Sequence, residues 1–404
     1  MNTPRKQIKL ENEESPQVAL PAIPGETVNE KQSRILKEKI SKLLGVDYNV
    51  KRVKSFPGAQ PISFTKCHIK ELLKENYYVC EKSDGIRVLV YLTENNGRQE
   101  VYLIDRKNIY RYIEGMVFPD PEDQSKLHKD TLFDGEIVND VYDDGSVVVR
   151  LYAFDCLLDR EKNLMQRPLN KRLGYLNKFI IEPHQKWRIK YLEDDDNTKK
   201  LPFELLLKRM EFSYELDKEL DMLHEKNNRF KHKSDGLIFT SLPAPYVIGT
   251  CTTMLKWKPS SENSIDFKLK CYYSSVKPSF PEQRPDKFEL HINKGNKGYN
   301  YYDELQVPDI LWEKWLKQEM VTKQETSERN LNLDGRIVEV CRKEYPDGSK
   351  KWEFMRFRDD KRDGNYFTVV TSILQSIDDN LTEDELRSTK DEIKNAWDQR
   401  SEVV

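Results

Sequence analysis

The sequence has no long apolar run, no paired cysteine motif and no strong excess of either charge. No apolar run approaches the ~20 residues of a membrane-spanning helix, and the polar first residues do not resemble a secretory signal. The six cysteines form no Cys-x-x-Cys pair, so neither a zinc site nor a disulfide framework is indicated, and a reducing compartment is favoured. A net charge of −2 gives no overall sign of nucleic-acid binding, so an anionic substrate would need a local basic groove.

Length and hydrophobic pattern predict at least two domains. The chain has 404 residues, of which 34% are charged and 37% hydrophobic, as in globular proteins of two or three domains. Apolar periodicity predicts helices at residues 29–44, 66–75, 167–179, 214–228, 310–320 and 382–400. Runs of β-branched and aromatic residues predict strands at 77–80, 88–92, 101–106, 131–138, 147–157, 203–210, 234–240 and 254–257. Short strand candidates at 265–272, 338–340 and 351–358 predict a small β-barrel, with 279–304 as a loop-rich stretch.

Lys82 is the first candidate for chemistry. It stands in Glu81-Lys82-Ser83-Asp84-Gly85, between the predicted strands at 77–80 and 88–92. The glycine permits a tight turn and a close approach of the backbone to a ligand. A lysine amine becomes a nucleophile at neutral pH where burial or neighbouring cations lower its pKa. Taken alone, Lys-x-Asp-Gly is more often a surface turn, so this interpretation depends on the rest of the chain.

Two further Asp-Gly pairs adjoin apolar strands. Asp134 and Glu136 lie two residues apart, so on a strand their side chains share one face. Buried carboxylates need a partner such as a metal, an arginine or a ribose hydroxyl, whereas the alternative is a solvated hairpin edge. Asp235, followed by Gly236, enters the strand at 234–240 in the same way. Three such pairs, each beside an apolar strand, favour a functional interpretation over chance.

Basic residues form two further patterns. Lys256 and Lys258 would share one face of a strand, either as ligands of an α-phosphate or as part of an exposed edge. Arg356 and Arg358 alternate with aromatic residues and would also share a face, which is either solvated or bound to phosphate. The acidic run at 194–196 is interpreted as a solvated loop rather than a metal site.

In this order, the motifs resemble those of the covalent nucleotidyltransferase superfamily of ATP-dependent ligases and mRNA capping enzymes, and most closely those of fungal-type nuclear mRNA guanylyltransferases. The motif at Lys82 has Ser83 where the family usually has threonine, which keeps a hydroxyl. Similar segments are residues 56–64, Arg106, 134–136, 152–157, 234–238 and 255–259. The Arg-x-Asp-Lys motif specific to capping enzymes is matched by Arg358, Asp360 and Lys361. The resemblance covers residues 21–400.

That resemblance implies an α+β fold with two domains. A nucleotidyltransferase domain of antiparallel sheets with flanking helices is expected at residues 19–261, after a disordered N-terminus at 1–18. An OB-fold β-barrel is expected at 262–377. A C-terminal helix within 378–404 is expected to pack back on the nucleotidyltransferase domain.

The resemblance also implies the reaction. Lys82 would attack GTP in the presence of Mg²⁺ or Mn²⁺, release pyrophosphate and carry GMP as a lysyl-Nζ phosphoramidate, and a 5′-diphosphate RNA end would accept it to form a GpppN cap. The metal ligands would be Glu136 and Asp235, which could also meet the ribose. The GTP-binding residues would be Arg87, Arg106, Glu136, Phe154, Lys208, Ile238, Lys256, Lys258, Arg358, Asp360 and Lys361.

Each of these residues has an implied role. Phe154 and Ile238 would sandwich the guanine, and Lys208, on the strand at 203–210, would read its O6 atom. The ribose and phosphates would be held by Arg87 and Arg106, the α-phosphate by Lys256 and Lys258, and the pyrophosphate by Arg358 and Lys361.

The implied partners are a separate RNA 5′-triphosphatase subunit and the phosphorylated carboxy-terminal tail of RNA polymerase II, in the nucleus and with no membrane. Two alternatives stay open. An ATP-dependent polynucleotide ligase would share Lys82 but use adenylate, and the motif at Arg358 argues against it. A non-enzymatic OB-fold adaptor would bind RNA or the polymerase tail, and the intact Lys82 with its paired acids argues against that.

Overall fold

The computed structural model describes residues 21–47, 56–123, 125–193, 201–224, 231–259, 262–274, 284–322, 333–359 and 361–402. The N-terminus predicted to be disordered (1–18), the acidic run at 194–196 and Asp360 lie outside these ranges. Among the described residues, no helix is both long enough and apolar enough to cross a bilayer.

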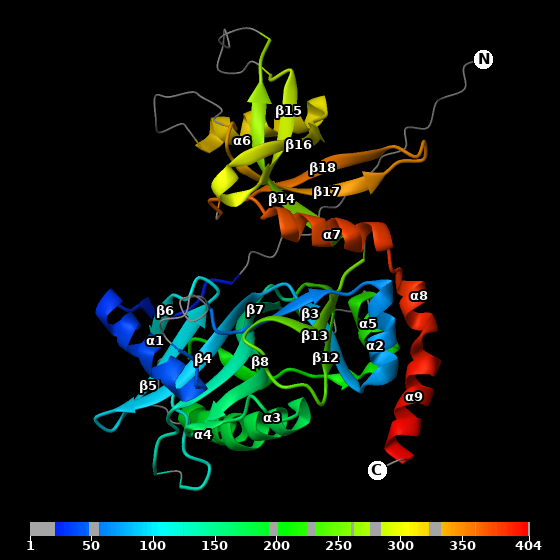
Figure 1. The fold of residues 1–404 in the computed structure, drawn as a ribbon. Helices are drawn as coiled ribbons and strands as arrows, with labels where there is room; N and C mark the ends of the chain where they lie inside the picture. The colour runs from blue at the N-terminus through cyan, green and yellow to red at the C-terminus, as the bar shows by residue number, and fades with distance from the viewer. Residues whose placement is uncertain are drawn as a thin grey trace, which may run out of the picture.

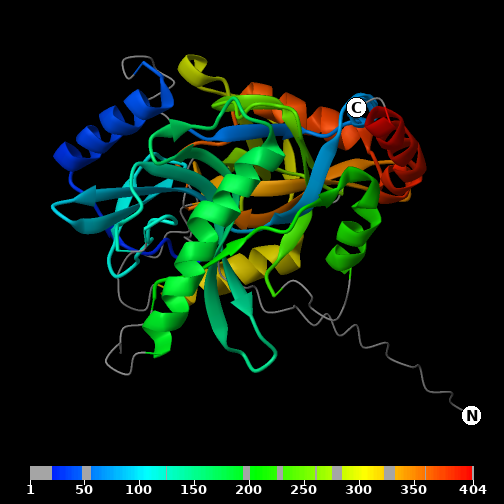
Figure 2. The same ribbon diagram turned by 90° about the horizontal axis from the view of Figure 1, so that it is seen from below.

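Two β-sheets form the first domain (Figures 1 and 2). The larger sheet has the order β1-β6-β5-β4-β7-β8-β10, with β9 beside β8, and the smaller has the order β11-β3-β12-β13-β2. The strands of the larger sheet are β1 (Glu26–Thr27), β4 (Ile86–Asn95), β5 (Arg98–Asp105), β6 (Tyr110–Ile113), β7 (Thr131–Val141), β8 (Val147–Asp159), β9 (Lys162–Asn163) and β10 (Glu204–Leu207). Those of the smaller sheet are β2 (Ala59–Ser63), β3 (Tyr77–Ser83), β11 (Glu211–Phe212), β12 (Ser234–Ser241) and β13 (Gly249–Trp257). Both sheets are mainly antiparallel, but β10 pairs with β8 and β2 pairs with β13 in parallel.

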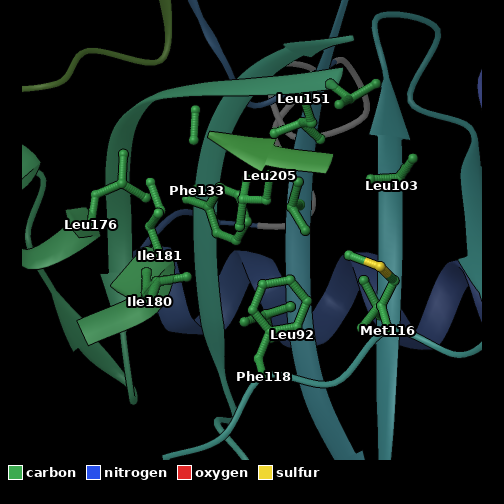
Figure 3. Close-up of a cluster of buried hydrophobic side chains, with 14 of the residues drawn as sticks. Leu92, Leu103, Met116, Phe118, Phe133, Leu151, Leu176, Ile180, Ile181 and Leu205 are labelled. Carbon is green, nitrogen blue, oxygen red and sulfur yellow. The ribbon is translucent and has the colours of Figure 1, made fainter. Parts of the chain in front are cut away.

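Strand β4 has buried apolar side chains on both of its faces, and helices cover both faces of the larger sheet. Val88 and Val90 belong to one core cluster, whereas Leu89 and Tyr91 belong to another. The first cluster is closed by α3 (Leu169–Tyr175) and a π-helical stretch (Leu176–Ile181). Helix α4 (Glu182–Glu193) follows, and its His184 stacks on Phe118 of the cluster, with ring centroids 4.4 Å apart. In Figure 3 the labelled members of this cluster are Leu92, Leu103, Met116, Phe118, Phe133, Leu151, Leu176, Ile180, Ile181 and Leu205. Because successive residues of a strand point to opposite faces, the nearly continuous apolar run of β4 serves both clusters.

Helix α1 (Glu30–Leu44) covers the other face of that sheet, and the helix predicted at 29–44 is confirmed within one residue. The helix begins where the side chain of Asn29 accepts a hydrogen bond of 2.9 Å from the backbone N–H of Gln32. It ends at Gly45, whose φ of 71° is in the left-handed region. Its buried apolar positions recur every four residues, at Leu36, Ile40 and Leu44.

A closed β-barrel of order β14-β15-β16-β18-β17 forms the second domain, as the OB-fold expectation requires. Its strands are β14 (Ser264–Tyr272), β15 (Lys287–Asn293), β16 (Tyr299–Gln306), β17 (Ile337–Glu344) and β18 (Lys350–Phe357). Its helices are α6 (Asp309–Thr322) and α7 (Phe367–Asp379), and α7 lies between the barrel and the first domain in Figure 1. The prediction of a loop-rich stretch at 279–304 is wrong, because β15 and most of β16 lie within it. In β15 only alternate residues are apolar and buried, since the other face is turned away from the barrel core.

The C-terminal segment returns to the first domain as two helices rather than the single helix predicted at 382–400. They are α8 (Glu383–Ser388), which begins with a capping box between Thr382 and Glu385, and α9 (Lys390–Glu402). With α2 (Ile69–Lys74) and α5 (Leu216–His224), they cover the smaller sheet (Figure 1). The ring of Trp397 packs against Phe212 and Tyr214, with centroids 4.9 and 5.1 Å away. The segment therefore closes the hydrophobic core of the first domain.

Replacing Arg172 with methionine is expected to destabilise the first domain by about 3–5 kcal/mol, the usual cost of breaking a buried ion pair. Its guanidinium meets both carboxylate oxygens of Asp155, at 2.7 and 2.9 Å, and each side chain is 2% exposed. The variant would leave the Asp155 carboxylate buried without its cation. Urea denaturation, with Arg34→Met as the control, would measure the loss.

In the control, Arg34 pairs with Glu38 at the surface, where an ion pair contributes about 1 kcal/mol or less. Equal losses of unfolding free energy in the two variants would contradict this prediction.

Candidate active site

The two sheets of the first domain line one pocket of about 210 Å³. It brings together most of the residues that sequence analysis assigns to GTP. Beside Lys82, the lining includes Arg87, Arg106, Glu136, Phe154, Lys208, Ile238 and Lys256. Residues of β3, β12 and β13 come from the smaller sheet, and residues of β4, β7 and β8 come from the larger one.

Lys82 lies near the end of β3, where the chain leaves the smaller sheet and enters the larger one. Asp84 and Gly85 connect β3 to β4, and these consecutive strands belong to different sheets. Space at this crossing is tight, because a Cβ on Gly85 would lie 2.5 Å from the carbonyl oxygen of Ile137. The crossing therefore depends on glycine. It leaves the Lys82 side chain partly buried between the two sheets, with 24% of its surface exposed.

Asp235 forms ion pairs with two lysines, Lys82 and Lys258. Its Oδ1 atom lies 2.7 Å from Nζ of Lys82, and its Oδ2 atom contacts Nζ of Lys258. Burial acts to raise the pKa of Asp235, but the two ammonium groups outweigh it and hold the pKa below its usual value. Asp235 is therefore an ionised anchor for the lysine that sequence analysis identifies as the nucleophile.

A β-bulge explains how Asp235 reaches Lys82. The register between β12 and β3 shifts between Ser234 and Leu237, so Asp235 and Gly236 lie outside the regular pairing. Gly236 has a φ of 153°, and a Cβ there would lie 2.1 Å from the carbonyl oxygen of Trp257. A bulge redirects the side chains next to it, and only glycine fits this one.

The cations of the pocket repel one another. Burial lowers the pKa of Lys256, and the nearby charges of Lys258, Lys82 and Arg106 lower it further. Asp235 offsets this repulsion only in part. A polyanion would relieve it, so the cluster is suited to binding a polyphosphate.

Phe154 and Ile238 reach the pocket from different sheets, on β8 and β12. In the pairing of β7 with β8, Asp134 is opposite Asp155 and Gly135 is opposite Ala153, so Phe154 is the extra residue of a bulge. The ring and the aliphatic side chain both remain partly exposed in the pocket. An aromatic face and a branched aliphatic side chain on flanking sheets can hold a flat heteroaromatic ring between them.

Arg87 packs against the ring of Phe154 and is held in place by Asp134. Its guanidinium lies 5.4 Å from the ring centroid of Phe154 and makes two hydrogen bonds to Asp134, at 2.9 and 2.6 Å. The hydroxyl of Tyr246 donates to the same carboxylate at 2.5 Å and lies 3.4 Å from the guanidinium. Arg87 is only 6% exposed, so most of its donors are already used within the protein. The arginine partner that sequence analysis considered for Asp134 is therefore Arg87.

Lys208 lies between the sheets, but not on the strand predicted at 203–210. Strand β10 ends at Leu207, the backbone N–H of Lys208 still bonds to Ala153, and the chain then joins the smaller sheet as β11. One continuous strand is impossible there because the two halves belong to different sheets. The ammonium of Lys208 donates to the hydroxyl of Ser83 at 2.7 Å and lies 3.1 Å from Glu81.

Arg358 and Lys361 do not line the pocket with Lys82. They lie on the barrel, where Arg358 is 3.5 Å from Asp266 and 3.3 Å from Glu339, and Lys361 contacts Asp266. The two acids hold the cations in place on the second domain. Asp360, the third residue of this motif, lies outside the described residues.

Comparisons with known proteins cover most of the chain. The family described as "mRNA capping enzyme, catalytic domain" matches residues 19–260, and "mRNA capping enzyme, C-terminal domain" matches residues 262–387. The chain belongs to the mRNA capping enzyme family. It is therefore a guanylyltransferase, and the alternatives of a ligase or a non-enzymatic adaptor are set aside.

Curated relatives of this capping enzyme carry the name "mRNA-capping enzyme subunit alpha". The protein from Schizosaccharomyces pombe is 38% identical over 93% of this chain and 89% of its own length. The protein from Neurospora crassa is 38% identical over 91% of both chains, and that from Saccharomyces cerevisiae is 34% identical over 94% and 87%. The similarity thus spans both domains of the enzyme.

Two carboxylates of the capping enzyme, Glu136 and Asp235, would be the ones to hold a divalent cation. No cluster of three or more histidine, cysteine or acidic side chains occurs in the part of the chain that the structure describes. Mg²⁺ is usually held by one or two carboxylates together with substrate phosphates, and Glu136 and Asp235 fit that pattern. Burial raises the pKa of Glu136, although Lys208, Lys82 and Arg106 act against it. A buried carboxyl of this kind would gain from a bound cation.

Sequence analysis missed Tyr246 and Glu81. Tyr246 belongs to no recognised motif and lies in a loop far along the chain from its partner Asp134. Glu81 directly precedes Lys82, so its position was visible, but its partners Lys208 and His232 come from distant segments. Only the fold brings Glu81 into the lining of the pocket and Tyr246 to Asp134 and Arg87 beside it.

Proposed function

We propose that this capping enzyme transfers GMP from GTP, through Lys82, to the 5′-diphosphate end of nascent RNA. The observation that carries the proposal is the position of Lys82, 2.7 Å from Asp235, in a pocket lined by further cations and by Phe154 and Ile238. In the first step, deprotonated Nζ forms a bond to the α-phosphorus, and the bond from that phosphorus to the bridging oxygen breaks. Pyrophosphate leaves, and GMP stays on Lys82 as a phosphoramidate.

Position and charge supply most of the rate enhancement in such a phosphoryl transfer. Lys256, Lys258 and Arg106 neutralise the triphosphate, and Asp235 orients Lys82 while the substrate binds. Asp235 and Glu136 would hold Mg²⁺ or Mn²⁺, which would supply further neutralisation of the phosphate oxygens. In the second step, an oxygen of the RNA β-phosphate attacks the α-phosphorus, and the amine of Lys82 leaves and recovers its proton.

Incubation with GTP labelled at the α-phosphate and a divalent metal, followed by denaturing electrophoresis, tests the first step. The label is expected to stay on the protein and to pass to RNA that ends in a 5′-diphosphate. Label that never becomes attached to the protein would contradict the covalent route.

The enzyme is expected to select guanine over adenine by as much as ~10⁴-fold, because a site with buried polar groups rejects a base with the wrong pattern of donors and acceptors. Phe154 and Ile238 enclose the ring, and Lys208 offers its ammonium to the carbonyl at position six. Adduct yields with equal concentrations of labelled GTP and ATP measure this selection. Similar yields from both nucleotides would contradict it and favour the ligase interpretation.

The enzyme acts in the nucleus with two partners. Relatives named "subunit alpha" imply a second subunit, and an RNA 5′-triphosphatase would supply the 5′-diphosphate end that the second step needs. Binding to the phosphorylated tail of RNA polymerase II would deliver the enzyme to nascent RNA. Binding of phosphorylated but not unphosphorylated tail peptide, and nuclear fluorescence of a tagged chain, are the results expected.

A further inference from the structure

A chain of buried polar contacts runs from the pocket to Asp140, near the end of β7. It begins with the ammonium of Lys208, which lies 3.1 Å from Oε2 of Glu81. The other carboxylate oxygen of Glu81 accepts from the hydroxyl of Ser83 at 3.0 Å and lies 3.2 Å from Nε2 of His232. Nδ1 of His232 lies 2.7 Å from Oδ1 of Asp140. One continuous path therefore connects a pocket residue to an imidazole that does not line the pocket.

The path is buried, and its charges alternate. Glu81, Lys208 and Asp140 are 4%, 5% and 1% exposed, and His232 is 9% exposed. Asp140 is fixed at the far end by Arg150 and by the hydroxyl of Tyr152, which donates at 3.0 Å. A buried charge that loses its partner is costly, so each member constrains the next.

We propose that His232 is a positioning residue for base recognition: its imidazolium fixes the carboxylate of Glu81, which fixes the Lys208 ammonium where it meets the base carbonyl. This inference rests on the proposed function, in which Lys208 meets the guanine. It assigns to His232, Glu81 and Asp140 a part in selecting the nucleotide, although neither His232 nor Asp140 lines the pocket.

Both ring nitrogens of His232 face carboxylates, so the position suits the doubly protonated ring. Burial acts to lower the pKa of His232, but its hydrogen bonds to Asp140 and Glu81 outweigh burial and raise the pKa above the usual value. The raised pKa widens the range of pH over which the ring stays doubly protonated, and the proton is lost as the pH rises through this pKa. A neutral ring has one N–H, and the shorter contact to Asp140 would keep it. Nε2 would then present a lone pair to the carboxylate of Glu81, and the hydrogen bond that fixes this carboxylate would be lost.

Among the residues that the structure describes, the charged and titratable groups that face His232 come from several elements. Glu81 faces the imidazole from β3, and Asp140 faces it from β7. The ring of Tyr152, on β8, has its centroid 5.3 Å from that of the imidazole. Its chain neighbours Lys231 and Lys233 pair elsewhere, with Asp143 and Asp84. The two carboxylates act together, against burial, to raise the pKa of His232.

The test compares two nucleotides that differ at position six of the base. The α,β-methylene triphosphates of guanosine and of 2-aminopurine riboside cannot donate GMP or its analogue to Lys82, so equilibrium binding is measured without chemistry. His232→Asn keeps an N–H for Asp140 but removes the nitrogen that faces Glu81. We expect the preference for the guanosine analogue to fall about tenfold in this variant, because a hydrogen bond to a charged group is misplaced.

The pH dependence gives a second readout. In the wild type, the preference is expected to fall over the range of pH in which the imidazolium loses its proton, that is, as the pH rises through the raised pKa of His232. In His232→Asn the preference is expected to stay low across that range.

A matched control is His128→Asn. His128 is also a buried histidine, 3.1 Å from the carboxylate of Asp159, but it does not line the pocket or contact Glu81. The control is expected to lower stability and to leave the preference, and its pH dependence, as in the wild type. Equal loss of binding of both analogues in His232→Asn, or a preference unaffected by pH in the wild type, would overturn the proposal.

The proposed function and the role of His232 can be refuted by different results. Absence of any labelled lysyl adduct from GTP would refute guanylyl transfer through Lys82. A normal adduct together with equal binding of the two analogues by the wild type would leave the transfer intact and refute the role of His232.

Discussion

Replacing Lys82 with arginine is expected to abolish the covalent GMP adduct, with a loss of rate on the order of 10⁶, as when the nucleophile of a covalent mechanism is removed. Arginine keeps the positive charge, so it can still pair with Asp235 and satisfy that buried carboxylate. Its guanidinium stays protonated, however, and cannot form a phosphoramidate. The substitution thus removes the nucleophile while the ion pair that holds β3 beside β12 is kept.

The measurement is electrophoresis after incubation with α-labelled GTP, with acid-labile and alkali-stable label as the signature of a phosphoramidate. Lys233→Arg is the matched control, because Lys233 is exposed and lies 3.8 Å from Asp84, beside the same motif but outside the pocket. The control is expected to form the adduct normally, and both variants should unfold at the wild-type temperature. Persistent labelling of Lys82→Arg would refute Lys82 as the nucleophile.

Local sequence patterns predicted the strands that carry the motifs. Lys82, Asp235 and Lys256 adjoin apolar runs that form β3, β12 and β13, because a buried strand shows itself in its own composition. The shared pocket could be expected only from the resemblance, because spacing alone does not say which strands are neighbours. After Lys82 the chain crosses from one sheet to the other, and Gly85 is the one feature of the local sequence that indicates this crossing.

The fine geometry of the pocket could not be predicted. Phe154 faces the pocket because β8 carries a bulge, and a bulge depends on pairing with β7 rather than on the residue itself. His232 reaches Glu81 across 151 positions of sequence. Such contacts depend on packing that no local pattern encodes, and the same limit explains the error at β10, where the chain changes sheets at Lys208.

The error at 279–304 has a different origin. Strand β15 does alternate, with Phe288, Leu290 and Ile292 buried in the barrel core. Its alternate positions are Lys, Glu and His, and β16 is mostly polar, so the average composition resembles a loop. The period of two was the better signal, and composition obscured it.

The position of Arg358 leads to the second large effect. Pyrophosphate leaves opposite the attacking amine, so a group outside the lysine-rich wall must hold it in line. Arg358 is held on the barrel by Asp266 and Glu339 and does not line the pocket. It can reach the leaving group only if the barrel moves toward the first domain, as lids do in many transferases. After pyrophosphate leaves, that contact is lost, and the barrel would reopen to admit RNA.

Replacing Arg358 with alanine is therefore expected to slow adduct formation by on the order of 10³, by analogy with arginine fingers, and to affect GMP transfer from a preformed adduct far less. Arg356→Ala is the matched control, because Arg356 lies two residues before Arg358, near the end of β18, and pairs with the same Glu339 at 2.6 Å, yet 55% of its side chain is exposed. Both half-reactions are measured separately, with the labelled adduct that each variant accumulates. If Arg358→Ala forms the adduct at the rate of Arg356→Ala, domain closure is not needed for the first step, and the motif on the barrel would serve RNA binding instead.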